Sequence, residues 1–327
     1  MHAYDVGVAH DGGYAEYVRV PGDWVVRRPE SMTAFDAMTL GTAGYTAAQA
    51  IMLMEHNGLK PDNGPVAVTG ATGGVGSVAV EILAKIGYHV VAITGKPEEA
   101  RYLRALGAKE VLQRQAIELT KIRPLDKSTW AGAIDNLGGD MLAWLLSTSK
   151  IGGTVAAVGL AAGMKLNTTV APFILRGVGA ARVPTAPIAP MSLRQKIWNK
   201  LAVEWRPDRV HDQVRTIDFD ELPTHFDPYL KGMVRGRTVV RIAPGLAPSR
   251  SRHAMSTLHS ELHRSSITDR EAFWRGESGA RRLADAVRRG ARLLASRRSR
   301  SGSSAGGSIS ATTRSIAISR RAATRRR

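Results

Sequence analysis

Three glycines at a regular spacing lie between a short apolar segment and a longer one. Gly70, Gly73 and Gly76 form a GxxGxxG pattern within VTGATGGVGSVAVEILAKIG, after a predicted strand and before a predicted helix. The first N–H groups of a helix lack partners within the helix and carry partial positive charge, and glycines leave them open to an anion. The pattern therefore predicts a turn that binds the pyrophosphate of a dinucleotide. The alternative is a turn that serves only close packing of strand against helix.

The end of the next apolar strand indicates which dinucleotide would bind. An NAD site usually has Asp or Glu there, which accepts from the ribose 2′-hydroxyl and would repel a 2′-phosphate. Here the strand ends in Thr94, Gly95 and Lys96, which offer a hydroxyl, close approach and a cation. Such groups suit a phosphate, so the sequence favours NADP over NAD. Glu98 and Glu99 follow and could supply the acid, but acids also suit the first turn of a helix.

The elements that must position these residues alternate along the chain. Two short strands are predicted within 14–26, further strands at 64–70, 88–94, 109–113, 131–138, 152–161 and 236–243, and helices at 33–39, 44–56, 74–87, 97–108, 139–150 and 191–205. Strand-helix-strand alternation is typical of a parallel sheet with helices on both faces. We therefore expect an α/β fold of the Rossmann type, doubly wound around a parallel sheet.

Composition narrows the function classes. The chain has 327 residues, enough for about two domains, and no cysteine, which excludes disulfides and a thiolate-ligated zinc site. Its net charge is +18, but from Pro244 onwards there are 19 arginines, no lysine and five acids, a net of +14. The remaining +4 gives no reason to expect a specific nucleic-acid partner. No apolar run is long enough for a membrane helix, so we expect a cytoplasmic protein.

At this point the motifs resemble a known family, the acrylyl-CoA reductase branch of the zinc-free medium-chain dehydrogenase/reductases, often named quinone oxidoreductases. The resemblance covers residues 11–243 and rests on VTGATGGVGSVAVEILAKIGYHVVAITGK, RALGAKEVL, TWAGAIDNLGG, GGTVAAVGLAAG, TTVAPFILRGV and GRTVVRI. It implies NADPH as cofactor, no zinc, a Rossmann domain inserted in a GroES-like β domain, and usually a homodimer. The expected domains are a remnant of the GroES-like catalytic domain at 1–33, an NADP-binding Rossmann domain at 34–178, an aberrant segment with a return to the catalytic domain at 179–243, and a basic, disordered tail at 244–327.

The resemblance also implies roles for individual residues. The pyrophosphate would lie against Gly70, Thr72, Gly73, Gly74, Val75 and Gly76, and the 2′-phosphate against Thr94, Gly95, Lys96 and Arg114. Leu160 and Ile174 resemble residues that line the nicotinamide end. Thr42, Tyr45 and Thr46 either face that cleft or are buried at the start of a helix. Asp135 is expected to cap a turn rather than to act in catalysis, and neither a catalytic residue nor a metal ligand is assigned.

Three departures from the family pattern stand out. The front part of the β domain, with its Asn-Tyr pair that contacts cofactor and substrate, precedes the position that matches Met1. Residues 179–190 read GAARVPTAPIAP where the family has an apolar strand, so we expect the sheet to lack that edge. The 84 residues from Pro244 onwards have no place in the family.

The tail carries a resemblance of its own. Residues 255–278 resemble the opening of AMP-forming acetyl- and propionyl-CoA synthetases, after which Arg, Ser, Ala and Gly dominate. One hypothesis is a chain built from shifted reading frames, and the alternative is a disordered basic arm that contacts nucleic acid or acidic lipid without specificity. His259 and His263 have the spacing of two metal ligands, but no third ligand is near, so a solvated surface is the favoured interpretation.

These observations together predict an NADPH-dependent oxidoreductase. Its expected reaction is reduction of the C=C bond of a short α,β-unsaturated acyl-CoA, acrylyl-CoA to propionyl-CoA, and the small acyl-CoA substrate is the expected partner. Two alternatives stay open: a quinone or aldehyde reductase on the same scaffold, and a truncated, non-catalytic product that binds NADPH weakly or not at all.

Overall fold

The computed structural model describes residues 4, 6–7, 10–183 and 189–242. All of them belong to the first of two compact units into which the chain divides, Met1–Leu246. The Arg-rich tail, the synthetase-like stretch 255–278 with His259 and His263, and the prolines at 184 and 187 lie outside the described residues.

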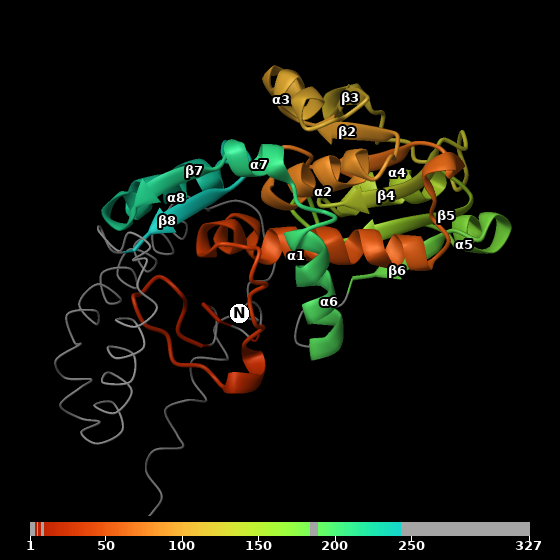
Figure 1. Ribbon diagram of the computed structural model, residues 1–327. Coiled ribbons are helices and arrows are strands. Elements are labelled where there is room, and N and C mark those ends of the chain that lie inside the picture. Colours follow the sequence, from red (N-terminus) through yellow and green to blue (C-terminus); the bar gives the residue numbers. More distant parts are fainter. Residues whose placement is uncertain (1–3, 5, 8–9, 184–188, 243–327) are drawn as a thin grey trace, which may run out of the picture. The chain divides into compact units, whose positions relative to one another are not determined.

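A six-stranded sheet in which every neighbouring pair is parallel forms the centre of the described chain (Figure 1). Its strand order is β3-β2-β1-β4-β5-β6. The strands are β1 (Val66–Thr69), β2 (Val90–Thr94), β3 (Glu110–Gln113), β4 (Trp130–Asp135), β5 (Ser149–Ala157) and β6 (Gly179–Arg182). The order reverses direction between β1 and β4, which makes the carboxyl ends of these two strands the switch point of a doubly wound fold. The predicted Rossmann-type α/β fold is confirmed.

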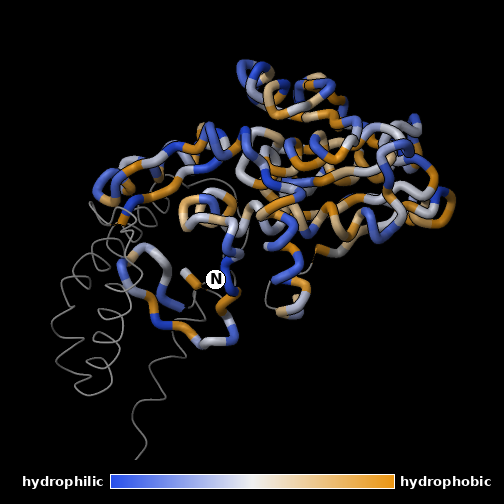
Figure 2. Tube along the Cα trace, viewed as in Figure 1, coloured by the Kyte–Doolittle hydropathy of each residue, from blue (hydrophilic) through white to orange (hydrophobic). Residues whose placement is uncertain are grey.

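Helices cover both faces of the sheet. They are α1 (Ala34–His56), α2 (Gly74–Lys85), α3 (Ala100–Ala105), α4 (Gly139–Ser147), α5 (Ala171–Arg176) and α6 (Met191–Ala202). Alternate strand residues belong to different cores: Val66 and Val68 pack with α1, α2 and α6, whereas Ala67 packs with α4. This two-sided burial explains why the strands read as continuous apolar runs, which Figure 2 shows along the chain trace.

A smaller sheet follows the Rossmann elements. After α7 (Asp208–Asp212) the chain forms β7 (Arg215–Asp218), α8 (Leu222–Leu230) and β8 (Thr238–Arg241), and β7 pairs with β8 in parallel. Short 3-10 helices lie at η1 (Gly22–Trp24), η2 (Pro61–Asn63), η3 (Pro97–Glu99), η4 (Arg114–Ala116) and η6 (Phe219–Glu221). The strand predicted at the end of the family motif GRTVVRI is therefore present as β8.

Two sequence-based expectations need correction. Residues 14–26 contain no strand, because the β-favouring residues there have no strand to pair with among the described residues. The sheet does not lack its last edge: β6 pairs with β5 from Thr154↔Gly179 to Ala157↔Arg182, and it ends before the first proline, at 184. The two helices predicted at 33–39 and 44–56 are present, by contrast: they share the label α1 and are separated by a kink at Gly41, whose backbone is not helical, with φ 51° and ψ −151°.

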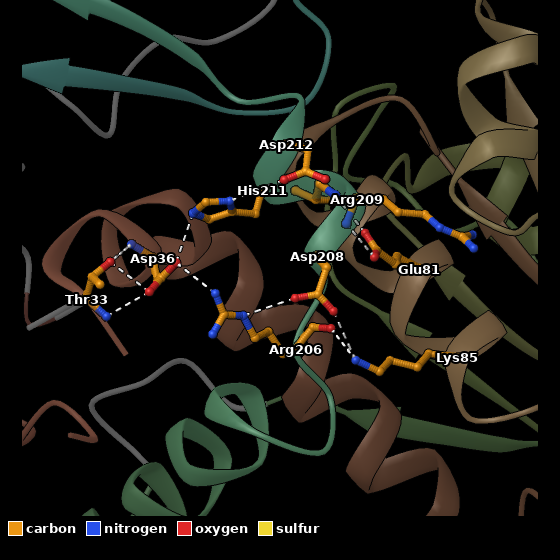
Figure 3. A network of polar contacts seen from close by, with 10 residues as sticks. Thr33, Asp36, Glu81, Lys85, Arg206, Asp208, Arg209, His211 and Asp212 are labelled. Atoms are coloured by element: carbon orange, nitrogen blue, oxygen red, sulfur yellow. Dashed lines mark hydrogen bonds and ion pairs between the residues drawn. The ribbon is translucent and has the colours of Figure 1, made fainter. Parts of the chain in front are cut away.

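The start of α1 is tied to α2 and α7 by a polar network (Figure 3). Thr33 and Asp36 form a capping box, in which the Asp36 N–H donates to Thr33 Oγ1 at 3.0 Å and the Thr33 N–H donates to Asp36 Oδ2 at 2.7 Å. The other carboxylate oxygen of Asp36 lies 2.9 Å from His211 Nε2 and 3.5 Å from Arg206 Nη2. One carboxylate therefore both caps α1 and binds the segment that leads into β7.

The same segment is held to α2 by a second carboxylate. Glu81 is buried and accepts the N–H groups of Arg209 and Val210 at 2.8 and 2.7 Å, one on each oxygen. Burial raises the pKa of Glu81 even though these two bonds lower it. Lys85 adds an exposed ion pair to Asp208 at 3.3 Å and donates to the Arg206 carbonyl at 2.8 Å. The first turn of α7 is thus fixed to one face of α2.

The turn between β1 and α2 leaves no room for a side chain at Gly76. A Cβ atom at this position would lie 2.4 Å from the Gly70 carbonyl oxygen and 2.7 Å from the Ala71 Cα atom. Both neighbours are backbone atoms, so they cannot move aside as a flexible side chain would. The glycine is therefore required for the close approach of α2 to the end of β1.

We predict that Asp36→Ala lowers the free energy of unfolding by about 2 kcal/mol at pH 7, because the change removes one half of the capping box and the contacts of Asp36 with Arg206 and His211. Although burial raises the pKa of Asp36, the hydrogen bonds from Thr33 and the charges of Arg206 and His211 lower it below its ordinary value of 3.8. The stabilisation is therefore present above that value and is lost as the pH falls through the folded pKa. Urea denaturation across pH measures it; exposed Asp140 in the first turn of α4 is the control, and an equal effect of Asp140→Ala would contradict the role of Asp36.

We predict that Gly76→Ala destabilises the chain by roughly 2–3 kcal/mol, since the backbone of the turn must shift to admit the methyl group. Thermal unfolding of the full chain measures this effect. Gly22→Ala is the matched control, because a Cβ atom at Gly22 would meet no atom within 4 Å. Equal melting temperatures for the two variants would show that the close approach carries no energetic weight.

Candidate functional site

The turn from β1 to α2 presents bare backbone at the carboxyl edge of the sheet. Gly73 is the N-cap residue of α2 and makes no side-chain cap bond. Backbone bonds close the turn instead: the Gly73 N–H donates to the Gly70 carbonyl and the Ser77 N–H donates to the Gly73 carbonyl, both at 2.9 Å. The N–H groups of Gly74, Val75 and Gly76 are left for an anion, as at other phosphate-binding helix termini.

The residues predicted to hold a 2′-phosphate lie together at the end of β2. The Lys96 N–H donates to Thr94 Oγ1 at 3.0 Å, which fixes the backbone around Gly95. The Arg114 guanidinium lies beside Gly95, because a Cβ atom there would be 3.7 Å from Arg114 Nε. Gln115 Nε2 donates to the Gly95 carbonyl at 3.1 Å and ties η4 to this strand end. Two cations thus flank a glycine, although 95 and 114 are far apart in sequence.

The Lys96 ammonium is not free in this structure. It donates to the Val234 carbonyl at 2.9 Å. Val234 begins a stretch, residues 234–237, that we name the return segment because it leads back to β8. The Gly236 N–H donates to the Thr72 carbonyl at 2.8 Å, so the return segment contacts both the glycine-rich turn and the end of β2.

Arg237 is a functional candidate that the sequence analysis missed. Its Nε donates to the Thr39 carbonyl of α1 at 2.8 Å, and its Cδ and Nη1 atoms would lie 3.2 Å from a Cβ atom at Gly74. Burial lowers the pKa of this guanidinium from its ordinary value, but arginine keeps its charge in proteins. A half-buried cation therefore lies directly beside the first turn of α2. Its sequence signal was weak: an arginine between a glycine and the apolar closing strand.

The two residues predicted at the nicotinamide end are both exposed. Leu160 lies in the loop after β5 with 60% of its surface exposed, and Ile174 lies on α5 with 72% exposed. The loop of Leu160 packs against Gly138, whose Cβ position is 3.2 Å from the Leu160 Cα atom. This contact sets the Leu160 backbone beside the end of β4, at the same edge of the sheet as the glycine-rich turn.

Of the three α1 residues that could face the cleft, Tyr45 is buried instead. Only 1% of Tyr45 is exposed, its ring centroid lies 6.5 Å from that of Trp198 on α6, and burial raises the pKa of its hydroxyl to about 12. The Thr46 hydroxyl donates to the Thr42 carbonyl of its own helix at 2.7 Å, so it is used within α1. The buried interpretation therefore holds for Tyr45.

Asp135 has a structural role, as expected. It is fully buried at the end of β4, accepts from the Thr69 hydroxyl at 2.6 Å and accepts from the Gly138 N–H at 2.7 Å. Asn136 adds a bond from its Nδ2 to the Thr69 carbonyl at 2.7 Å. These bonds join the ends of β1 and β4 across the switch point and so hold the glycine-rich turn in place.

The described residues contain neither a candidate metal centre nor a candidate membrane-spanning helix. Residues 4, 6–7, 10–183 and 189–242 contain no group of three or more His, Cys, Asp or Glu side chains that could hold a metal ion. Over the same ranges, no helix has the length and apolar character needed to cross a membrane.

Comparison with known proteins identifies the fold's relatives. A family model described as zinc-binding dehydrogenase matches residues 74–183. The acrylyl-CoA reductase AcuI of Ruegeria pomeroyi is 46% identical over 242 residues, which span 74% of this chain and 73% of that protein.

Two solved structures share the fold at similar identity. The YhdH protein of Escherichia coli K-12, solved with bound NADPH, is 43% identical with a TM-score of 0.70, and the match covers 73% of each chain. The YhfP protein of Bacillus subtilis, solved with bound NAD, is 44% identical with a TM-score of 0.70, covering 73% of this chain and 72% of that one. YhfP carries a quinone oxidoreductase assignment. With these identities over nearly three quarters of its relatives' lengths, the chain belongs to the acrylyl-CoA reductase and quinone oxidoreductase branch of the medium-chain dehydrogenase/reductase superfamily.

Proposed function

We propose that the chain is an NADPH-dependent oxidoreductase that reduces the C=C bond of a short α,β-unsaturated acyl-CoA, with acrylyl-CoA as substrate and propionyl-CoA as product. The observation that carries the cofactor assignment is a pair of cationic positions at one sheet edge. Arg237 lies beside the uncapped turn of α2, and Lys96 with Arg114 flanks Gly95 at the end of β2. NADPH carries two anionic groups that match these positions: its pyrophosphate suits the turn of α2, and its 2′-phosphate suits the end of β2.

The residues present fit this cofactor. The backbone N–H groups of Gly74, Val75 and Gly76 would hold the pyrophosphate, with Thr72 and Gly73 completing the turn from Gly70. Arg237 would neutralise the same phosphates, while Gly95, Lys96 and Arg114 would hold the 2′-phosphate next to Thr94. Leu160 and Ile174 would shield the nicotinamide end from water, since both present exposed apolar surface that a ligand can cover.

When bound, the cofactor would supply a hydride to the β-carbon of the unsaturated thioester; the electron pair of the C=C bond moves toward the thioester oxygen as an enolate, and the α-carbon then takes up a proton that comes from solvent. The chain's part is to hold the cofactor at the sheet edge and to exclude water around the reacting carbons. The substrate assignment is supported by the relatives, because AcuI of R. pomeroyi is named as an acrylyl-CoA reductase. A coenzyme A thioester carries phosphates of its own, which suits a site with cations at its rim.

A second candidate is a quinone reductase on the same scaffold. The quinone oxidoreductase assignment of YhfP, a relative 43% identical over 241 residues, favours it.

By the family resemblance, we further propose that the chain forms a homodimer in the cytoplasm. We also propose that its domain boundaries lie at 33/34 and 178/179.

We predict that Arg114→Gln weakens NADPH binding by about tenfold, the loss of one charge-assisted hydrogen bond, and leaves NADH binding within about twofold of the original. Fluorescence titration of both nucleotides against the full chain measures the two dissociation constants. Arg123→Gln is the matched control, because Arg123 is an exposed cation outside the site. Equal losses for NADPH and NADH would argue against a 2′-phosphate contact at Arg114.

We predict that the full chain oxidises NADPH in the presence of acrylyl-CoA and forms propionyl-CoA, with a much lower rate on a benzoquinone. The absorbance of NADPH at fixed enzyme concentration follows both reactions, and mass spectrometry identifies the acyl product. Turnover of the quinone alone would favour the second candidate. Tight NADPH binding without turnover on either substrate would mean that this chain binds the cofactor but does not catalyse the reaction.

A further inference from the structure

An acid lies close to the predicted 2′-phosphate position. Glu99 is the last residue of η3, three residues after Lys96, and its side chain is 19% exposed. An acid after the second strand of a Rossmann fold usually selects NAD, because its charge repels a 2′-phosphate. Glu98, its neighbour, is exposed. Glu99 therefore opposes the NADP preference that Lys96 and Arg114 create.

Arg235 in the return segment pairs with this acid. Its Nη1 atom lies 3.0 Å from Glu99 Oε2, and its guanidinium carbon lies 4.7 Å from the ring centroid of Tyr102 on α3. An arginine that is both paired with a carboxylate and stacked on an aromatic ring has a defined orientation. The guanidinium is therefore committed to Glu99 and Tyr102.

The backbone on both sides of Arg235 is fixed to the cofactor site. The carbonyl of the preceding residue, Val234, accepts from Lys96 at 2.9 Å, and the N–H of the following residue, Gly236, donates to the Thr72 carbonyl at 2.8 Å. The Gly236 Cβ position is 3.3 Å from the Tyr102 hydroxyl, so the segment lies closely against α3. Arg235 thus reaches Glu99 from a backbone that is anchored to the same two elements that would hold the phosphates.

We propose that Arg235 is a specificity-determining residue that acts through Glu99. By neutralising this carboxylate, it removes the charge that would otherwise repel a 2′-phosphate from Lys96 and Arg114. The proposal rests on the proposed NADPH site and adds to it: a residue more than a hundred positions away from β2, with no contact to the phosphate required, sets which of the two nicotinamide dinucleotides is preferred. Removal of Arg235 therefore shifts the preference from NADP toward NAD.

The test measures the dissociation constants of NADPH and NADH for the full chain and for the variants Arg235→Gln, Glu99→Gln and the double variant. Arg235→Gln weakens NADPH binding by about tenfold, because an unpaired carboxylate then lies near the 2′-phosphate. NADH binding stays within about twofold of the original value, since NADH has no 2′-phosphate to be repelled by Glu99. The double variant regains NADPH binding to within about threefold of the original chain, because no acid is left to mask.

Lys231→Gln is the matched control: it removes one exposed cation from the loop just before the return segment and leaves both affinities unchanged. A double variant that binds NADPH as weakly as Arg235→Gln would overturn the proposal, since Arg235 would then act by direct contact with the phosphate. Equal losses for NADPH and NADH in Arg235→Gln would overturn it as well, because they indicate a collapsed site. An original chain without NADPH preference contradicts the proposed cofactor instead, and masking is still judged from the change in the NADPH-to-NADH ratio between the single and double variants.

Discussion

The close approach of α2 to the end of β1 is the constraint on which the rest of this structure depends. A Cβ atom at Gly76 would overlap the backbone of Gly70 and Ala71, so the first turn of α2 lies directly against the residues that follow β1. This places the uncapped N–H groups of α2 at the switch point between β1 and β4, where Asp135 and Thr69 hold the two strand ends together. The same helix then carries Glu81, which fixes α7 and the chain that follows it.

The return segment converts this scaffold into a site with two charged positions. Its backbone bonds to Thr72 and receives the Lys96 ammonium, while its arginines point to different partners: Arg237 toward the Thr39 carbonyl and Arg235 toward Glu99. The four residues of the return segment thus contact the glycine-rich turn and the first turn of α2, the end of β2, and an acid at the end of η3. Two cations proposed to contact phosphate, Lys96 and Arg237, each donate to a backbone carbonyl.

Much of this could be predicted from the sequence, for physical reasons. The strands of the parallel sheet are buried on both faces, so they appear in the sequence as apolar runs. The GxxGxxG turn could be predicted as well, because the motif and the turn that it forms lie in one short stretch of sequence. The edge strand β6 was not predicted, because its residues, Gly-Ala-Ala-Arg, have low strand propensity and prolines follow them; pairing with β5 makes this segment a strand. The roles of Arg235 and Arg237 could not be predicted from the residues around them, because their partners, Glu99 and Thr39, are distant in sequence. The predicted domain boundaries and the phosphate roles of Lys96 and Arg114 stay predictions.

The separation of these partners along the chain has a consequence for biosynthesis. The bond from Arg237 to Thr39 joins residues 198 positions apart, and that from Lys96 to Val234 joins residues 138 apart. During translation all six strands of the sheet have been made once β6 has emerged from the ribosome, and only α6, which packs on one face of the sheet, has still to follow. The return segment, which contacts the glycine-rich turn and the end of β2, has been made only after about fifty further residues. A nascent chain therefore acquires its fold before it acquires a finished nucleotide pocket.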